Sequence, residues 1–146
     1  MIIELLPSQI PELWEVIKLG AIRSSEVPEA NIPTFSNRLL QGLLSGKVSC
    51  LIRLGEGRTV LGILLAQIQE NLITGDRELN CWGIYSFRVI DEESMLAGLE
   101  VLKKIAKANK CDRMITMSRH PRVWTLFEGA GWTELTRLYV YPIKEV

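Results

Sequence analysis

Three strand-like segments follow one another in the middle of the chain and constrain its fold more than any other feature. Residues 60–69 are almost entirely apolar, which is typical of a strand buried on both faces. Residues 48–54 precede this segment and residues 79–89 follow it, and both connections contain glycine, as turns between strands do. The pattern therefore predicts a run of antiparallel strands at the centre of a sheet.

Segments with helical periodicity precede and follow this run of strands. The clearest helix covers residues 94–110, where Leu96, Leu99 and Leu102 recur on one face and charged residues on the other. Ser8 and Thr34 are candidate N-caps for two earlier helices. The predicted elements are strand 2–6, helix 9–24, helix 35–46, strand 48–54, strand 60–69, strand 79–89, helix 94–110, strand 113–117, helix 121–129 and strand 134–143.

The order of elements is thus β-α-α-β-β-β-α-β-α-β. Such an order predicts an α+β fold, with a mixed and mostly antiparallel sheet flanked by helices. A chain of 146 residues is long enough to bury one good core, and it contains no linker or repeat. We therefore expect a single domain over residues 1–146.

Composition excludes several classes of function. The formal net charge is zero, so no overall field favours nucleic acid or anionic lipid. No apolar run approaches the roughly 20 residues of a membrane span, and residues 2–6 look like a strand and not a signal peptide. The three cysteines are far apart in apolar surroundings, as buried free thiols are, and predict a reducing compartment. One histidine and no clustered cysteines predict that there is no metal site.

Residues 120–132, His-Pro-Arg-Val-Trp-Thr-Leu-Phe-Glu-Gly-Ala-Gly-Trp, read as a short helix that ends at a glycine and runs into an aromatic residue. This block resembles the penultimate motif of the GNAT acyltransferase superfamily, roughly Asn-x-x-Ala-x-x-x-Tyr-Glu-x-x-Gly-Phe. The spacing, the Glu and the Gly-aromatic end match, whereas His120 stands at the Asn and Phe127 at the Tyr. The order of elements is also that of GNAT proteins, so the resemblance covers nearly the whole chain.

The resemblance implies binding of acetyl-CoA at the start of the helix over residues 94–110. GNAT enzymes carry Val-x-Pro-x-x-Arg-x-x-Gly-x-Gly there, and the backbone N–H groups of the helix start hold the pyrophosphate. In this chain Tyr85 takes the Val position, Phe87 the Pro and Ile90 the Arg. The glycine loop becomes Asp91-Glu92-Glu93-Ser94-Met95, without glycine and with three carboxylates.

These carboxylates favour a helix that is stabilised by its own anions. Asp91 or Ser94 can cap the free N–H groups, and Glu92 and Glu93 complement the helix dipole. The same charges repel a pyrophosphate placed there. The sequence therefore predicts a degraded acetyl-CoA loop.

Candidate catalytic residues are Glu78, Tyr85 and His120. The resemblance implies a general base that is either a Glu on the fourth strand or a chain of waters. Glu78 and Glu70 border that strand, and Tyr85 is a further polar candidate at its splayed end. His120 is the only histidine, between Arg119 and Arg122, at a helix start that more often holds a cap or a surface residue. Phe127 cannot protonate the leaving thiolate as the family's Tyr does, and we expect it in the core with Trp124 and Trp132.

Anion contacts, if the cofactor binds, are expected from arginine, which pairs with phosphate in a bidentate manner. The candidate cofactor-binding residues are Tyr85, Phe87, Arg88, Arg119 and Arg122. The basic run from Lys103 to Arg122, with seven basic residues and one acid, is either a solvated face or part of such a site.

Two hypotheses for the function follow. The first is a divergent acetyl-CoA-dependent N-acyltransferase that acts on a small-molecule or protein amine. The second is a non-catalytic structural or interaction protein with a GNAT fold, of the kind found in phage virions. A protein partner or a homo-oligomer fits either hypothesis. We expect a cytoplasmic protein, or a virion protein if the source is a phage.

Overall fold

The computed structural model describes residues 1–89 and 91–144, so Ile90, predicted at the family's Arg position, lies outside the described residues. Their sheet has five strands in the order β1-β2-β3-β4-β5. The pairs β1–β2, β2–β3 and β3–β4 are antiparallel, and the pair β4–β5 is parallel. The strands are β1 (Ile2–Glu4), β2 (Val48–Leu54), β3 (Val60–Glu70), β4 (Arg77–Ser86) and β5 (Arg113–Thr116). The predicted α+β fold with a mostly antiparallel sheet is confirmed.

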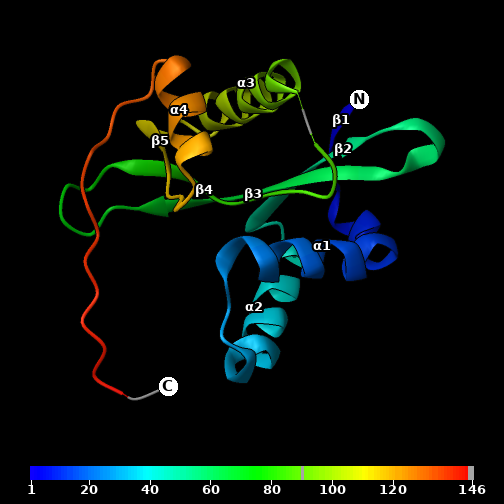
Figure 1. Cartoon of the computed structure of the whole chain (residues 1–146), viewed down its shortest axis with the longest axis horizontal. Coiled ribbons are helices and arrows are strands. Elements are labelled where there is room, and N and C mark those ends of the chain that lie inside the picture. The colour runs from blue at the N-terminus through cyan, green and yellow to red at the C-terminus, as the bar shows by residue number, and fades with distance from the viewer. Residues whose placement is uncertain (90, 145–146) are drawn as a thin grey trace.

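Helices cover both faces of this sheet. Figure 1 shows α1 (Ile10–Ser25) and α2 (Ile32–Leu44) on one face, and α3 (Glu92–Ala108) and α4 (Pro121–Gly129) on the other. Each layer closes over its own hydrophobic core. Gly20 lets α1 approach the sheet closely, because a Cβ there would lie 2.6 Å from the Ile63 side chain.

Strand β3 separates the two cores, as its apolar sequence predicts. Ile63 and Leu65 pack in the core under α1 and α2, while Leu64 and Ala66 pack in the core under α3 and α4. Successive side chains of a strand point to opposite faces, so a strand covered on both faces must be apolar at every position.

A bulge in β4 changes which side chains face which core. Leu65 pairs with Gly83 and Ala66 pairs with Cys81, which leaves Trp82 as the extra residue. Cys81 before the bulge and Ile84 after it therefore both belong to the α3 side, while Tyr85 packs on the α1 side. An extra residue inverts the alternation of a strand beyond it, and this inversion sets the direction of Tyr85.

Three predicted boundaries and caps are wrong. β4 ends at Ser86 and not at residue 89, and Val89 is exposed. Ser8 lies inside a 3₁₀ turn (Pro7–Gln9), and Thr34 lies inside the first turn of α2, whose N-cap position is Asn31. Helices α1 and α2 each have a proline in the first turn, where the missing N–H costs nothing, so α2 begins before Thr34.

The predicted last strand over residues 134–143 is also wrong for the single chain. Residues 133–143 follow α4 as an extended, exposed segment without strand pairing, and in Figure 1 this segment runs away from α4 past the sheet. A strand forms only where another backbone accepts and donates its hydrogen bonds, and composition alone does not supply that partner.

In the part of the chain that the structure describes, no helix combines the length and the apolar character needed to cross a membrane.

Candidate functional site

The site begins where the pairing of β4 and β5 stops. The parallel pairing runs from Glu78 with Arg113 to Cys81 with Thr116, and the Thr116 hydroxyl donates to the Cys81 carbonyl at 2.8 Å. β4 continues to Ser86, and within residues 1–89 and 91–144 no strand pairs with residues 82–86 on that side. Backbone N–H and C=O groups along this stretch are thus available to a ligand.

Tyr85 stands on this unpaired stretch and is held by α1. Arg23 Nη1 donates a hydrogen bond to the Tyr85 hydroxyl at 3.1 Å, and the guanidinium lies 5.8 Å from the ring centroid. The Phe87 ring packs edge-on at 4.9 Å from the Tyr85 ring. Because the Tyr85 oxygen accepts this hydrogen bond, its own proton remains available for donation.

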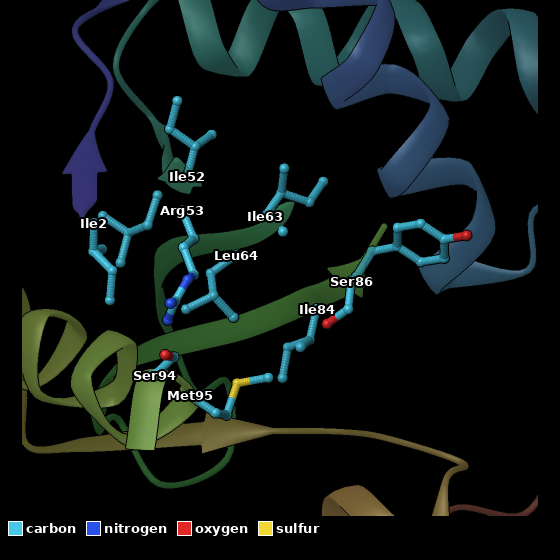
Figure 2. A pocket seen from close by; sticks show the side chains of 12 residues that line it. Ile2, Ile52, Arg53, Ile63, Leu64, Ile84, Ser86, Ser94 and Met95 are labelled. Atoms are coloured by element: carbon cyan, nitrogen blue, oxygen red, sulfur yellow. The ribbon is translucent and has the colours of Figure 1, made fainter. Parts of the chain in front are cut away.

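A groove lies between the start of α3 and the sheet (Figure 2). Its lining includes Arg53 of β2, Ile84 and Ser86 of β4, and Ser94 and Met95 of α3. Figure 2 shows Arg53 extending from β2 toward Ser94 at the helix start. The groove therefore combines apolar walls with the Arg53 cation and the hydroxyl groups of Ser86 and Ser94.

Arg53 carries unused hydrogen-bonding capacity at this helix start. Its Nη1 lies 3.6 Å from the Asp91 carboxylate, while its Nε is buried and finds no hydrogen-bond partner among the described residues. A buried donor without a partner is costly, so its position next to a groove marks a candidate anion contact. Arg53 is not among the residues predicted from the sequence, although an arginine within the apolar strand 48–54 is a visible signal.

Asp91 occupies the predicted N-cap position of α3, but neither Asp91 nor Ser94 makes the predicted capping bond to a backbone N–H. Instead, the Ser94 hydroxyl donates to the Asp91 carboxylate. This hydrogen bond lowers the pKa of Asp91, and the charge of Arg53 lowers it further. Asp91 is therefore ionised and paired with Arg53. Glu92 and Glu93 add further negative charge at the helix start, and Arg53 does not pair with them.

Glu78 lies at the opposite end of β4 from Tyr85 and is buried, at 1% exposure. Charged side chains near strand ends are usually exposed, and the burial of Glu78 departs from that pattern. Arg113 Nε donates to Glu78 at 2.5 Å, and Gln69 donates at 3.3 Å. Burial raises the pKa of Glu78, but the hydrogen bonds and the charge of Arg113 outweigh it, and the net pKa is lowered. Glu78 therefore links β4 to β5 through its ion pair with Arg113.

The residues around α4 lie apart from Tyr85 in the sequence, and the structure gives each a surface position. His120 takes the N-cap position of α4 and makes no side-chain capping bond, while Arg88 and Arg122 are exposed. Arg119 Nη1 forms an ion pair of 2.5 Å with Glu26, just after α1. This pair joins the loop before α4 to the end of α1, and sequence reasoning did not indicate it.

Phe127 is a core residue, as predicted. It is buried under α4, and its ring lies 4.6 Å from the ring of Trp132. Trp124 does not join them, because 49% of it is exposed and its indole N–H donates to the Ser118 carbonyl. Phe127 therefore anchors α4 and offers no acidic proton to a ligand.

The cysteines offer no reactive thiolate in the two cores. Cys50 and Cys81 are buried, which raises the pKa of each thiol to about 12, while Cys111 is only partly buried. Across residues 1–89 and 91–144, no three side chains of His, Cys, Asp or Glu are grouped so as to hold a metal ion.

The chain resembles known proteins in structure and not in sequence. No model of a known protein family matches the chain, and no curated protein matches its sequence. Solved structures do match over the whole length. A protein described as a probable acetyltransferase has a TM-score of 0.73 at 14% identity, covering 100% of this chain and 99% of its own.

Two further structures extend this likeness. The predicted acetyltransferase from Clostridium acetobutylicum, solved with acetyl-CoA, has a TM-score of 0.73 at 13% identity and covers 98% of this chain and 96% of its own. The ribosomal-protein-alanine N-acetyltransferase from Brucella melitensis biovar Abortus 2308 has a TM-score of 0.68 at 17% identity, covering 98% and 99%. This chain therefore has the GNAT fold of the acetyltransferases.

Proposed function

We propose that this protein is an acetyl-CoA-dependent N-acyltransferase whose cofactor lies along the unpaired stretch of β4. The observation that carries the proposal is the end of the β4–β5 pairing at Cys81 and Thr116, which leaves residues 82–86 open on one side. A structural neighbour from Clostridium acetobutylicum was solved with acetyl-CoA, which supports the same ligand here.

The residues present fit such a cofactor at two points. The open backbone of residues 82–86 can bind an extended amide chain as a neighbouring strand would. Arg53, with its unpartnered buried Nε, can bind an anion at the start of α3, where backbone N–H groups and the helix dipole also favour negative charge. Arg53 thus takes over part of the task that glycines perform in the family's loop.

Acetyl-CoA, when bound, supplies an acyl group on a thioester. Tyr85 then holds a hydroxyl proton at the open stretch, oriented by Arg23 and by the Phe87 ring. We assign Tyr85 the role of general acid toward a leaving thiolate, which Phe127 cannot fill from the core. The acceptor is an amine of a small molecule or of a protein. Glu78 is excluded as its base in this proposal, because Arg113 and Gln69 occupy its carboxylate.

A second candidate function is a non-catalytic binding or structural protein, including a phage virion component. The observation that favours it is the acidic start of α3, where Glu92 and Glu93 are exposed beside the groove. These charges oppose a pyrophosphate at short range, although water and salt screen them.

Acetyl transfer separates the two candidates. Purified protein incubated with acetyl-CoA and a mixture of primary amines and lysine peptides is expected to yield acetylated product, detected by mass spectrometry. Tyr85→Phe should lower turnover by about 100-fold, the order of general acid catalysis, while leaving acetyl-CoA binding in place.

Arg53 provides the matched test of binding. Arg53→Ala should weaken acetyl-CoA binding by about 10-fold through loss of a charge-assisted contact. The control Arg58→Ala, in the turn between β2 and β3, should leave binding unchanged. Equal affinities of the two variants would remove Arg53 from the site, and absence of any product would favour the second candidate.

A further inference from the structure

Polar side chains replace the apolar ones on part of the sheet, on the side of α1 and α2. Strand alternation continues along β3 from Ile63 and Leu65, which pack in the core on that side, to Gln67 and Gln69. The pairing of β3 with β4, and of β4 with β5, brings further residues to the same side. This set, here called the polar face, consists of Gln67, Gln69, Glu78, Asn80, Arg113 and Ile115.

The polar face extends beyond α1 and α2. In Figure 1 these two helices lie under the centre of the sheet, while β3 and β4 continue past them to their connecting turn. Gln67 is exposed, and Ile115 belongs to neither hydrophobic core of the described residues. A ligand can therefore reach this part of the sheet from the side of α1 and α2.

Hydrogen bonds link the polar side chains of this face in a row. Asn80 Nδ2 donates to Gln69 Oε1 at 3.2 Å, and Gln69 Nε2 donates to Glu78 Oε1 at 3.3 Å. Arg113 pairs with Glu78 at the far end of the row. Because each amide group is held by its neighbour, Asn80 presents its oxygen in a defined orientation.

Two polar atoms next to this row have no partner. Asn80 Oδ1 and Trp82 Nε1 are buried, and neither makes a hydrogen bond among the described residues. Trp82 is the extra residue of the β4 bulge, and the Phe35 ring of α2 packs edge-on against it at 6.1 Å. One atom is an acceptor and the other a donor, so a ligand that satisfies both removes the cost of two unpaired groups.

A hydroxyl group matches this combination, since it donates to an amide oxygen and accepts from an indole N–H. Neighbouring hydroxyl groups can also bind the two atoms separately. Gln67 pairs with Asn80 across the strands and is exposed, so its flexible side chain can move aside or contribute a further hydrogen bond. The charges of Glu78 and Arg113 offset each other, so the polar face offers no counter-charge to a second ammonium or to a carboxylate.

We propose that the acceptor is an amine with neighbouring hydroxyl groups, as in amino sugars and amino alcohols, and that these groups bind Asn80 and Trp82. The inference rests on the proposed acetyl transfer, because Trp82 is also the first residue of the open stretch 82–86. The hydroxyl groups then lie on the polar face while the amine lies at the open stretch. In the transfer, the amine nitrogen gains the acetyl group and gives up one proton to water. Tyr85 protonates the leaving thiolate and regains a proton from water.

Matched pairs of amines test this substrate class. Serinol and isopropylamine share one carbon skeleton and differ in their hydroxyl groups, and glucosamine and cyclohexylamine compare ring amines in the same way. The kcat/KM of acetyl transfer should favour the hydroxylated amine of each pair by about 100-fold, because a site built to bind a hydroxyl group rejects an analogue that lacks it. Comparison of serinol with glucosamine separates open-chain amino alcohols from sugars.

Asn80→Leu and Trp82→Phe test the two atoms. Each substitution removes the polar atom and keeps a side chain of similar shape, and each should lower the preference for the hydroxylated amine by about 10-fold. The basicity of the amines is the same in every variant and cannot cause this change. Asn37→Leu, at an exposed position of α2, is the matched control and should keep the preference. Circular dichroism confirms that the helices of each variant are intact, and Trp82→Phe carries the test if Asn80→Leu does not fold.

Binding without acetyl-CoA separates this inference from the proposed function. Saturation-transfer NMR should show contact of glucosamine with the wild-type chain and with Asn37→Leu, and loss of that contact in Asn80→Leu. Equal kcat/KM within each pair, or preferential acetylation of a lysine peptide or of spermidine, would overturn the inference while acetyl transfer stands. Product from none of the amines would overturn the proposed function. Glucosamine contact that is absent, or unchanged by Asn80→Leu, would overturn the inference in either case.

Discussion

At the residue scale, Glu78 is the clearest case in which the fold uses a charge structurally. It is buried between β3, β4 and β5, and it receives hydrogen bonds from Arg113 and Gln69. Asp76 lies 3.7 Å from the same arginine, so the cation has a second partner. Buried ion pairs contribute little net stability, yet removal of one partner is costly because the other is left uncompensated.

Glu78→Ala should therefore lower the free energy of unfolding by about 2 kcal/mol, less than for a fully buried pair because Arg113 is partly exposed and keeps Asp76. Urea unfolding measures the change. The control Glu70→Ala, an exposed carboxylate at the end of β3, should change stability by less than about 0.5 kcal/mol. Equal effects of the two substitutions would contradict the structural role of Glu78.

The pH dependence of stability follows from the same carboxylate. The pKa of Glu78 is lowered in the folded state, so its contribution is present above the unfolded value of about 4.3 and is lost as the pH falls through the folded value. Urea unfolding between neutral pH and pH 3 should show a shallower acid loss for Glu78→Gln than for the wild type. Parallel curves would show that Glu78 titrates alike in both states.

At the acidic start of α3, we expect that removing charge increases the affinity for acetyl-CoA. Glu92→Gln with Glu93→Gln removes two exposed like charges near the proposed pyrophosphate contact. Acetyl-CoA affinity should rise several-fold, with the largest gain at low salt, because screening weakens exposed charges. Glu128→Gln, at the end of α4, is the matched control and should not change the affinity. A loss of affinity in the double variant would place the phosphates elsewhere.

At the element scale, a local residue pattern predicts the bounds of a helix or strand well when clear start and end signals mark both of its ends. The bounds of β2 and α4 coincide with the prediction because apolar residues, turn glycines and Pro121 mark both ends. The caps at Ser8 and Thr34 failed because prolines in the first turns moved the helix starts. The bulge at Trp82 leaves no trace in composition, since it arises from pairing with β3.

Helix α4 depends on one buried anchor. Phe127→Ala should lower the free energy of unfolding by about 3 kcal/mol, through lost burial and the cavity left beside Trp132. Thermal unfolding followed by circular dichroism measures it. Trp124→Ala removes a larger but half-exposed ring from the same helix and should cost clearly less. The reverse order would mean that α4 is held by its outer face.

At the scale of the whole molecule, the sequence predicts the GNAT fold but only part of the candidate site. Tyr85 and Phe87 are both candidates from the sequence, and the structure shows that their rings pack against each other. Arg23, Glu26 and Arg53 were missed, because the first two reach their partners across about 60 to 90 residues of chain and Arg53 meets α3 only once the sheet is built. Side chains that meet through tertiary packing have no spacing signal in one sequence.

The central proposal is that the open stretch of β4 and the start of α3 hold acetyl-CoA although Asp91, Glu92 and Glu93 stand at that helix start. Isothermal titration calorimetry of acetyl-CoA into the wild-type chain tests it most directly, with desulfo-CoA and ATP as controls. The account predicts micromolar binding of acetyl-CoA and desulfo-CoA, and weaker binding of ATP, which lacks the chain that pairs with β4. No binding at millimolar acetyl-CoA would contradict it and would show that the fold serves another purpose.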